Sequence, residues 1–109
     1  MVEPLLLLII SMLPMYGYQI AKELNMRSYG YFKFSGSTIY SALRRLENEG
    51  LLLSSWQQVA QKQGRRYYEI TGKGRQILAE KLAELQKFYY ATSKVMSDVN
   101  LISGTGARE

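Results

Sequence analysis

The fold is decided by residues 35–50, which read SGSTIYSALRRLENEG. Their apolar residues recur at spacings of three and four, which predicts an amphipathic helix: Ile39, Ala42, Leu43 and Leu46. Ser35 or Ser37 can cap the start of this helix, and Gly50 can end it. Polar side chains occupy another face at the same spacings: Ser37, Tyr40, Ser41 and Arg44. The segment is therefore a helix with one buried face and one polar face.

The residues after this helix change to a strand pattern. Residues 51–59 predict a strand, residues 60–64 a polar turn, and residues 65–70 a returning strand. Side chains alternate between the two faces of a strand, so Arg65 and Arg66 point in opposite directions. We expect one of these two arginines, rather than both, to face a ligand. Trp56 is expected to pack against the body of the domain rather than to stack on a ligand.

Helices are predicted on both sides of this central region. Residues 2–13 form an apolar helix that Pro14 ends, and residues 17–28 form an amphipathic one. Thr71 can cap a last, long helix. Its apolar residues repeat every three and four positions over three heptads, which is typical of a helix that pairs with another: Leu78, Leu82, Leu85, Tyr89, Thr92, Met96 and Val99. Phe88 and Val95 lie beside this seam.

The element order predicts a mostly α fold with a small β-hairpin, a winged helix-turn-helix of order α-α-α-β-β-α. We expect residues 1–73 to form the winged-helix domain and residues 74–100 the pairing helix. The small polar residues of 101–109 predict a disordered tail. In this layout the third helix suits a DNA major groove, and the hairpin suits the flanking phosphates.

Composition excludes several classes of protein. The 109 residues contain no cysteine and no histidine, which removes disulfides, zinc sites with thiolate or imidazole ligands, and histidine acid–base catalysis. Asp98 is the only aspartate, and the glycines at 64, 72 and 74 do not fit a phosphate-binding loop. We therefore expect no enzyme, no metal and no cofactor. The apolar run at residues 5–10 is too short to span a bilayer, so we expect a cytoplasmic protein.

The net charge of +5 is concentrated in one segment. Residues 54–75 carry five bases against the single acid Glu69, whereas the rest of the chain is nearly balanced. Such a concentration is typical of contact with a polyanion, although from charge alone a solvated charged loop explains it better.

In sequence the chain resembles the PadR family of bacterial transcriptional regulators over residues 5–98. The residues that carry the resemblance are, in order, Tyr16-Gly17-Tyr18 with Ile20, Tyr31-Phe32-Lys33-Phe34-Ser35, residues 38–47 (TIYSALRRLE), Glu49-Gly50-Leu51, Trp56, residues 64–71 (GRRYYEIT) and Gly74-Arg75. The resemblance implies a homodimeric winged-helix repressor that pairs through its C-terminal helices, in the small subgroup with one such helix. Ser37 and Ser41 stand where the family often has glycine and proline, which leaves the start of the third helix open.

Candidate DNA contacts follow from the layout. On the third helix they are Ser35, Ser37, Thr38, Tyr40, Ser41 and Arg44, and on the hairpin they are Lys62, Arg65 and Arg66. Lys33, just before the third helix, is a weaker candidate. Arg45 is also weaker, because it can instead pair with Glu49 one turn later. Tyr40 can equally pack against the second helix.

Two further surfaces are predicted, and one alternative function stays open. The dimer interface is expected to contain Leu78, Leu82, Leu85, Phe88, Tyr89, Thr92, Val95 and Met96. A small-molecule effector could bind among Met12, Met15, Phe88, Tyr89 and Met96, although these residues fit a plain dimer core better. The alternative to a DNA-binding regulator is a protein-interaction module whose basic hairpin meets an acidic partner.

Overall fold

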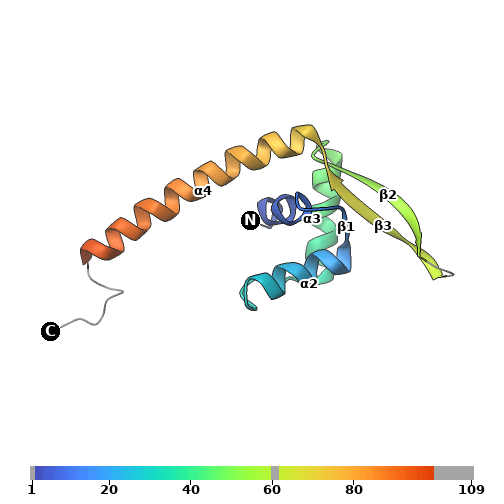
Figure 1. The fold of residues 1–109 in the computed structure, drawn as a ribbon, viewed down its shortest axis with the longest axis horizontal. Helices are drawn as coiled ribbons and strands as arrows, with labels where there is room; N and C mark the ends of the chain where they lie inside the picture. Colours follow the sequence, from blue (N-terminus) through green and yellow to red (C-terminus); the bar gives the residue numbers. More distant parts are fainter. Residues whose placement is uncertain (1, 60–61, 100–109) are drawn as a thin grey trace. The chain divides into compact units, whose positions relative to one another are not determined.

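The computed structural model describes residues 2–59 and 62–99 (Figure 1). These residues form, in order, α1 (Glu3–Ile10), β1 (Met15–Tyr16), α2 (Gly17–Arg27), α3 (Gly36–Asn48), β2 (Leu52–Val59), β3 (Lys62–Ile70) and α4 (Gly72–Val99). The chain consists of two compact units, Met1–Leu78 and Ala79–Glu109. The first unit contains everything up to the second turn of α4, and the predicted winged-helix fold is confirmed there.

The core of the first unit lies between its three short helices and the sheet. Its largest fully buried side chains come from every one of these elements: Leu6, Leu7, Ile10, Met15, Ile20, Ile39, Leu43, Leu46 and Leu52. The apolar N-terminal helix is thus a core helix, as predicted. It ends at Ile10, three residues earlier than expected, where the Ser11 hydroxyl donates to the carbonyl of Leu8 at 2.6 Å. Within residues 2–59 and 62–99, no helix is both long and apolar enough to cross a membrane.

The sheet has three antiparallel strands in the order β1-β3-β2. The short strand β1 pairs Met15 with Tyr68 and Tyr16 with Tyr67, where the sequence predicted only a turn. Strand β3 begins at Lys62, so residues 62–64 lie in a strand instead of the predicted turn. Pairing with β2 continues to that point, because Val59 is the partner of Lys62. The hairpin therefore extends well beyond the helices of its unit (Figure 1).

The end of α3 and the start of α4 are joined by a set of short polar contacts. The Thr71 hydroxyl donates to the carbonyl of Gly50 at 2.7 Å and accepts from the amide of Gly74 at 2.9 Å, which confirms Thr71 as the cap of α4. Gly50 has a φ of +79°, which favours glycine after a helix. A Cβ at Gly74 would collide with the backbone of Leu51. This junction holds the start of α4 against the end of α3.

Candidate nucleic-acid interface

The buried residues of α3 determine which of its other residues point outward. Ile39, Ala42, Leu43 and Leu46 are all buried, and at 100° per residue the opposite side of the helix carries Ser37, Ser41, Arg44 and Asn48. All four of these polar residues are exposed, and we call them the α3 polar face. Asn48 was not among the predicted contacts, although its position four residues after Arg44 places it on this face. Arg44 forms no hydrogen bond or ion pair with any residue that the structure describes.

Hydroxyl side chains at the start of α3 cap its first turn. Ser35 is the cap: its Oγ accepts from the amide of Thr38 at 3.3 Å and lies 3.0 Å from the Thr38 hydroxyl. The Ser37 hydroxyl lies 3.2 Å from the same oxygen. The helix therefore begins at Gly36, which settles the choice that the sequence left open between Ser35 and Ser37.

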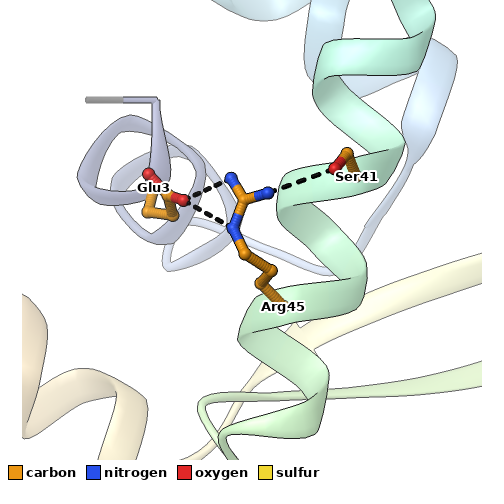
Figure 2. Close-up of polar contacts among 3 residues, drawn as sticks. All are labelled: Glu3, Ser41 and Arg45. Atoms are coloured by element: carbon orange, nitrogen blue, oxygen red, sulfur yellow. Dashed lines mark hydrogen bonds and ion pairs between the residues drawn. The ribbon is translucent and has the colours of Figure 1, made fainter.

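Arg45 does not pair with Glu49, so that prediction is wrong. Figure 2 shows the Arg45 guanidinium between Glu3 of α1 and Ser41 of α3. Its Nε donates to Glu3 Oε2 at 2.9 Å, Nη2 pairs with the same oxygen, and Nη1 donates to Ser41 Oγ at 3.1 Å. The packing of α1 beside α3 brings Glu3 to a residue 42 positions away, which no local pattern predicts. Arg45 therefore joins two helices at one edge of the α3 polar face.

Tyr40 flanks the other edge of this face and packs against α2. A Cβ at Gly17, the first residue of α2, would overlap the Tyr40 phenol ring. Tyr40 as a whole is still 49% exposed. The packing alternative is thus observed for one side of the ring, while its other side remains accessible.

Glu47 brings the hairpin beside α3. Its Oε2 accepts a hydrogen bond from the Ser54 hydroxyl of β2 at 2.6 Å and lies 3.7 Å from Nη2 of Arg66 on β3. Tyr40 and Glu47 are seven residues apart, so they share the side of α3 that faces the hairpin. The α3 polar face and the hairpin are therefore neighbours on one surface of the first unit.

The two hairpin arginines lie on opposite faces of the sheet, as predicted. Arg65 has its guanidinium carbon 4.3 Å from the centroid of the Tyr16 ring, on the outer face. Arg66 lies 5.6 Å from the Trp56 centroid, on the face shared with buried Tyr68. Trp56 is 66% exposed, so the expectation that it packs against the body is wrong. The Lys62 side chain lies outside the described part of the chain.

Candidate effector and dimer residues are divided between the core and the surface. Met15 is 2% exposed and Leu78 is 6% exposed, so both belong to the core of the first unit and neither is open to a ligand or a partner helix. Met12 lines an apolar groove of about 390 Å³ on α1 and α2, together with Leu5, Leu8, Leu24 and Phe32. Phe88, Tyr89 and Val95 are exposed on α4. An effector site stays a prediction.

Metal ligands do not cluster in the part of the chain that the structure describes. No group of three or more carboxylates is close enough there to hold an ion, and the sequence has no histidine or cysteine. Each arginine of this surface either pairs with a single carboxylate or has no carboxylate partner among the described residues. Their arrangement suits an anionic partner.

A three-helix core whose third helix lies beside a β-hairpin defines a winged helix-turn-helix protein. The chain belongs to the transcriptional regulator PadR-like family, whose model matches residues 6–80. A PadR-like transcriptional regulator of Bacillus cereus is 27% identical, with a TM-score of 0.76 over 87% of this chain and 90% of that one. Bacillus subtilis PadR, solved in complex with operator DNA, is 19% identical with a TM-score of 0.69, over 95% of this chain and 66% of that one, and shares the fold.

A relative in Lysinibacillus sphaericus, described as an uncharacterised protein, is 32% identical over 69 residues. The match spans 63% of this chain and 63% of that protein.

The ion pair between Arg45 and Glu3 predicts a pH-dependent contribution to stability. The Arg45 guanidinium, mainly through its hydrogen bonds, holds the pKa of Glu3 below its ordinary value of 4.5. The pair therefore stabilises the fold fully above pH 4.5, and this stabilisation is lost as the pH falls through the lowered pKa. Because the pair is partly exposed, we expect Glu3→Gln to lower the free energy of unfolding at pH 7 by about 0.5–1 kcal/mol in urea titrations.

Glu49→Gln is the matched control, since Glu49 is the partner that helical spacing alone suggests for Arg45. It should leave the free energy of unfolding unchanged. An equal loss in Glu49→Gln, or a loss in Glu3→Gln that stays constant from pH 7 to pH 3, would contradict the observed pairing.

Proposed function

We propose that the protein is a sequence-specific, double-stranded DNA-binding transcriptional repressor that acts as a homodimer on an inverted-repeat operator. The observation that carries this proposal is the α3 polar face, with unpaired Arg44 at its centre, directly beside a hairpin that carries Arg65 and Arg66. The family membership and the operator complex of Bacillus subtilis PadR support the same function.

The side chains of the α3 polar face are suited to base edges. Arginine forms paired hydrogen bonds to guanine and asparagine to adenine, each worth about 1–3 kcal/mol of discrimination against a wrong base. Arg44 and Asn48 are one helical turn apart and exposed, so both can reach the same stretch of a major groove. Ser37 and Ser41 are short, which lets the helix backbone approach the bases closely.

The hairpin supplies affinity that does not depend on sequence. Residues 54–75, which cover most of the hairpin and the start of α4, hold five bases against one acid, so their charge excess of +4 accounts for most of the net charge of +5. Lysine and arginine near phosphates release condensed counterions and thereby make binding sensitive to salt. Lys33, exposed just before α3, is suited to the same role.

The proposed homodimer would form through the second half of α4. Its apolar seam continues after Leu78 with side chains that are largely exposed, among them Leu85 at 57% and Tyr89 at 72%. Pairing of two such helices would bury the seam, since heptad spacing keeps it facing a partner. Two copies would then present two α3 helices to half-sites about 34–36 Å apart, or a multiple of that distance.

Salt titration tests the DNA-binding function. We expect the logarithm of the binding constant for a random duplex to fall linearly with the logarithm of salt concentration, with a slope near −0.9 per phosphate contacted. On a duplex selected from a random pool by the wild type, Arg44→Ala should weaken binding by about tenfold or more, because it removes a base contact. Fluorescence anisotropy with labelled duplexes measures both quantities.

Arg27→Ala provides the control, because it removes the same charge from the far end of α2. It should change the affinities for selected and random duplexes little and equally. If Arg44→Ala and Arg27→Ala behave alike on the selected duplex, the base-contact role is wrong. Binding that ignores salt, or no binding at low salt, would favour the alternative of an acidic protein partner.

Dimerisation makes a separate prediction. Leu85→Asp places a charge in the α4 seam and should shift the protein from dimer to monomer in sedimentation velocity, because an unpaired charge is costly to bury. Ala83→Asp adds the same charge on the opposite side of α4 and should leave the dimer intact. A monomeric wild type, or a dimer that survives Leu85→Asp, contradicts pairing through this seam.

A further inference from the structure

The two adjacent arginines of β3 have different surroundings, although both were candidates for contact with DNA. Arg66 has a carboxylate within ion-pair distance, since its Nη2 lies 3.7 Å from Oε2 of Glu47. Arg65 has no acidic partner within the described residues, and its guanidinium is stacked on Tyr16 instead. An aromatic ring orients a guanidinium but does not neutralise its charge, whereas a carboxylate does. The two side chains are thus unequal as phosphate ligands.

Arg66 sits in a cluster that links the hairpin to α3. On the hairpin, Arg66 lies across from Trp56, and Ser54 lies across from Tyr68, in two neighbouring cross-strand pairs on one face. Burial raises the pKa of the Tyr68 phenol, and the nearby Arg66 guanidinium opposes that rise. Arg66 therefore interacts with groups of its own sheet on the side toward α3.

Glu47 is the group of α3 that meets this cluster. One carboxylate oxygen, Oε2, both accepts the Ser54 hydroxyl at 2.6 Å and faces Arg66. Each strand of the hairpin thus has one side chain held by the same oxygen. The strands of the hairpin extend away from the helices (Figure 1), so a contact with α3 can fix the hairpin's position.

We propose that Glu47 and Arg66 are positioning residues that fix the hairpin beside α3, and that Arg65 is the hairpin arginine that contacts a DNA phosphate. This inference rests on the proposed function. It assigns unequal roles to two neighbouring residues of the same type. Moving Arg66 onto a phosphate would leave Glu47, an acid, unpaired next to DNA.

The salt slope separates a phosphate contact from a positioning role. Each lost phosphate contact lowers the slope by about 0.9, whereas a displaced hairpin weakens binding without removing a particular counterion-releasing pair. We expect Arg65→Gln to reduce the slope on a random duplex by about one. Arg66→Gln should weaken binding by about three- to tenfold and leave the slope unchanged. A reduction of the slope by one in Arg66→Gln overturns the assignment.

Removal of Glu47 provides a test in which simple electrostatics predicts the opposite sign. Loss of an acid near DNA should by charge alone strengthen binding, and Glu49→Ala, a matched exposed acid at the same end of α3, should keep or strengthen it. We expect Glu47→Ala instead to weaken binding by about three- to tenfold, because the hairpin loses its anchor. Ser54→Ala changes no charge and should weaken binding in the same direction. Tighter binding by Glu47→Ala contradicts the proposal.

Trp56 reports on the hairpin without DNA, because it is the only tryptophan in the chain and lies across from Arg66. In free protein whose thermal unfolding remains cooperative, Glu47→Ala should lower the fluorescence anisotropy of Trp56, and Glu49→Ala should not. Unchanged anisotropy in Glu47→Ala counts against the anchor. Absence of DNA binding by the wild type would contradict the proposed function itself, whereas wild-type binding with equal slopes in Arg65→Gln and Arg66→Gln contradicts this inference alone.

Discussion

Burial of one stripe of α3 is the constraint on which the surface chemistry depends. Ile39, Ala42, Leu43 and Leu46 are each at most 2% exposed, and they leave the helix only one orientation about its axis. Rotation by a single residue, 100°, would bring polar side chains into the core, where an unpaired charge or hydroxyl is costly. Arg44 points outward as a consequence of this packing. The chemistry of the α3 polar face is therefore fixed by apolar residues that never contact a ligand.

Polar contacts at the two edges of α3 fix the positions of the elements that lie beside it. Arg45 is held by Glu3 on the side of α1, and Glu47 holds Ser54 on the side of the hairpin. Each contact is partly exposed and contributes little to stability by itself. Their value lies in geometry, since they place α1 and the hairpin at defined sides of the polar face. Arg44, between these edges, has no carboxylate partner in residues 2–59 and 62–99.

Local periodicity predicted what depends on neighbours in sequence. The helix at 36–48, its cap, the hairpin and the opposite directions of Arg65 and Arg66 all follow from spacings of two, three or four residues. Contacts between segments that are far apart in the sequence leave no such spacing pattern. The pairing of Glu3 with Arg45 and the two-residue strand β1 both depend on how elements pack, and a strand of two residues is too short to show alternation.

The sequence pattern also did not predict which residues of a long helix or strand are buried and which are exposed. The heptad pattern of α4 runs through Leu78 without a break, yet this residue belongs to the core of the first unit, and the free seam begins after it. Trp56 shows the converse, since a large apolar residue in a strand is expected to be buried, yet this side chain is 66% exposed. Both outcomes depend on how the elements pack.

Contact between the α3 polar face and DNA should protect that face from alkylation. The chain has no cysteine, so Asn48→Cys and Met26→Cys each introduce one reactive thiol, on the polar face and on exposed α2 respectively. Saturating duplex DNA should slow maleimide modification at position 48 severalfold and leave position 26 unchanged. Equal rates at position 48 with and without bound DNA would contradict the claim.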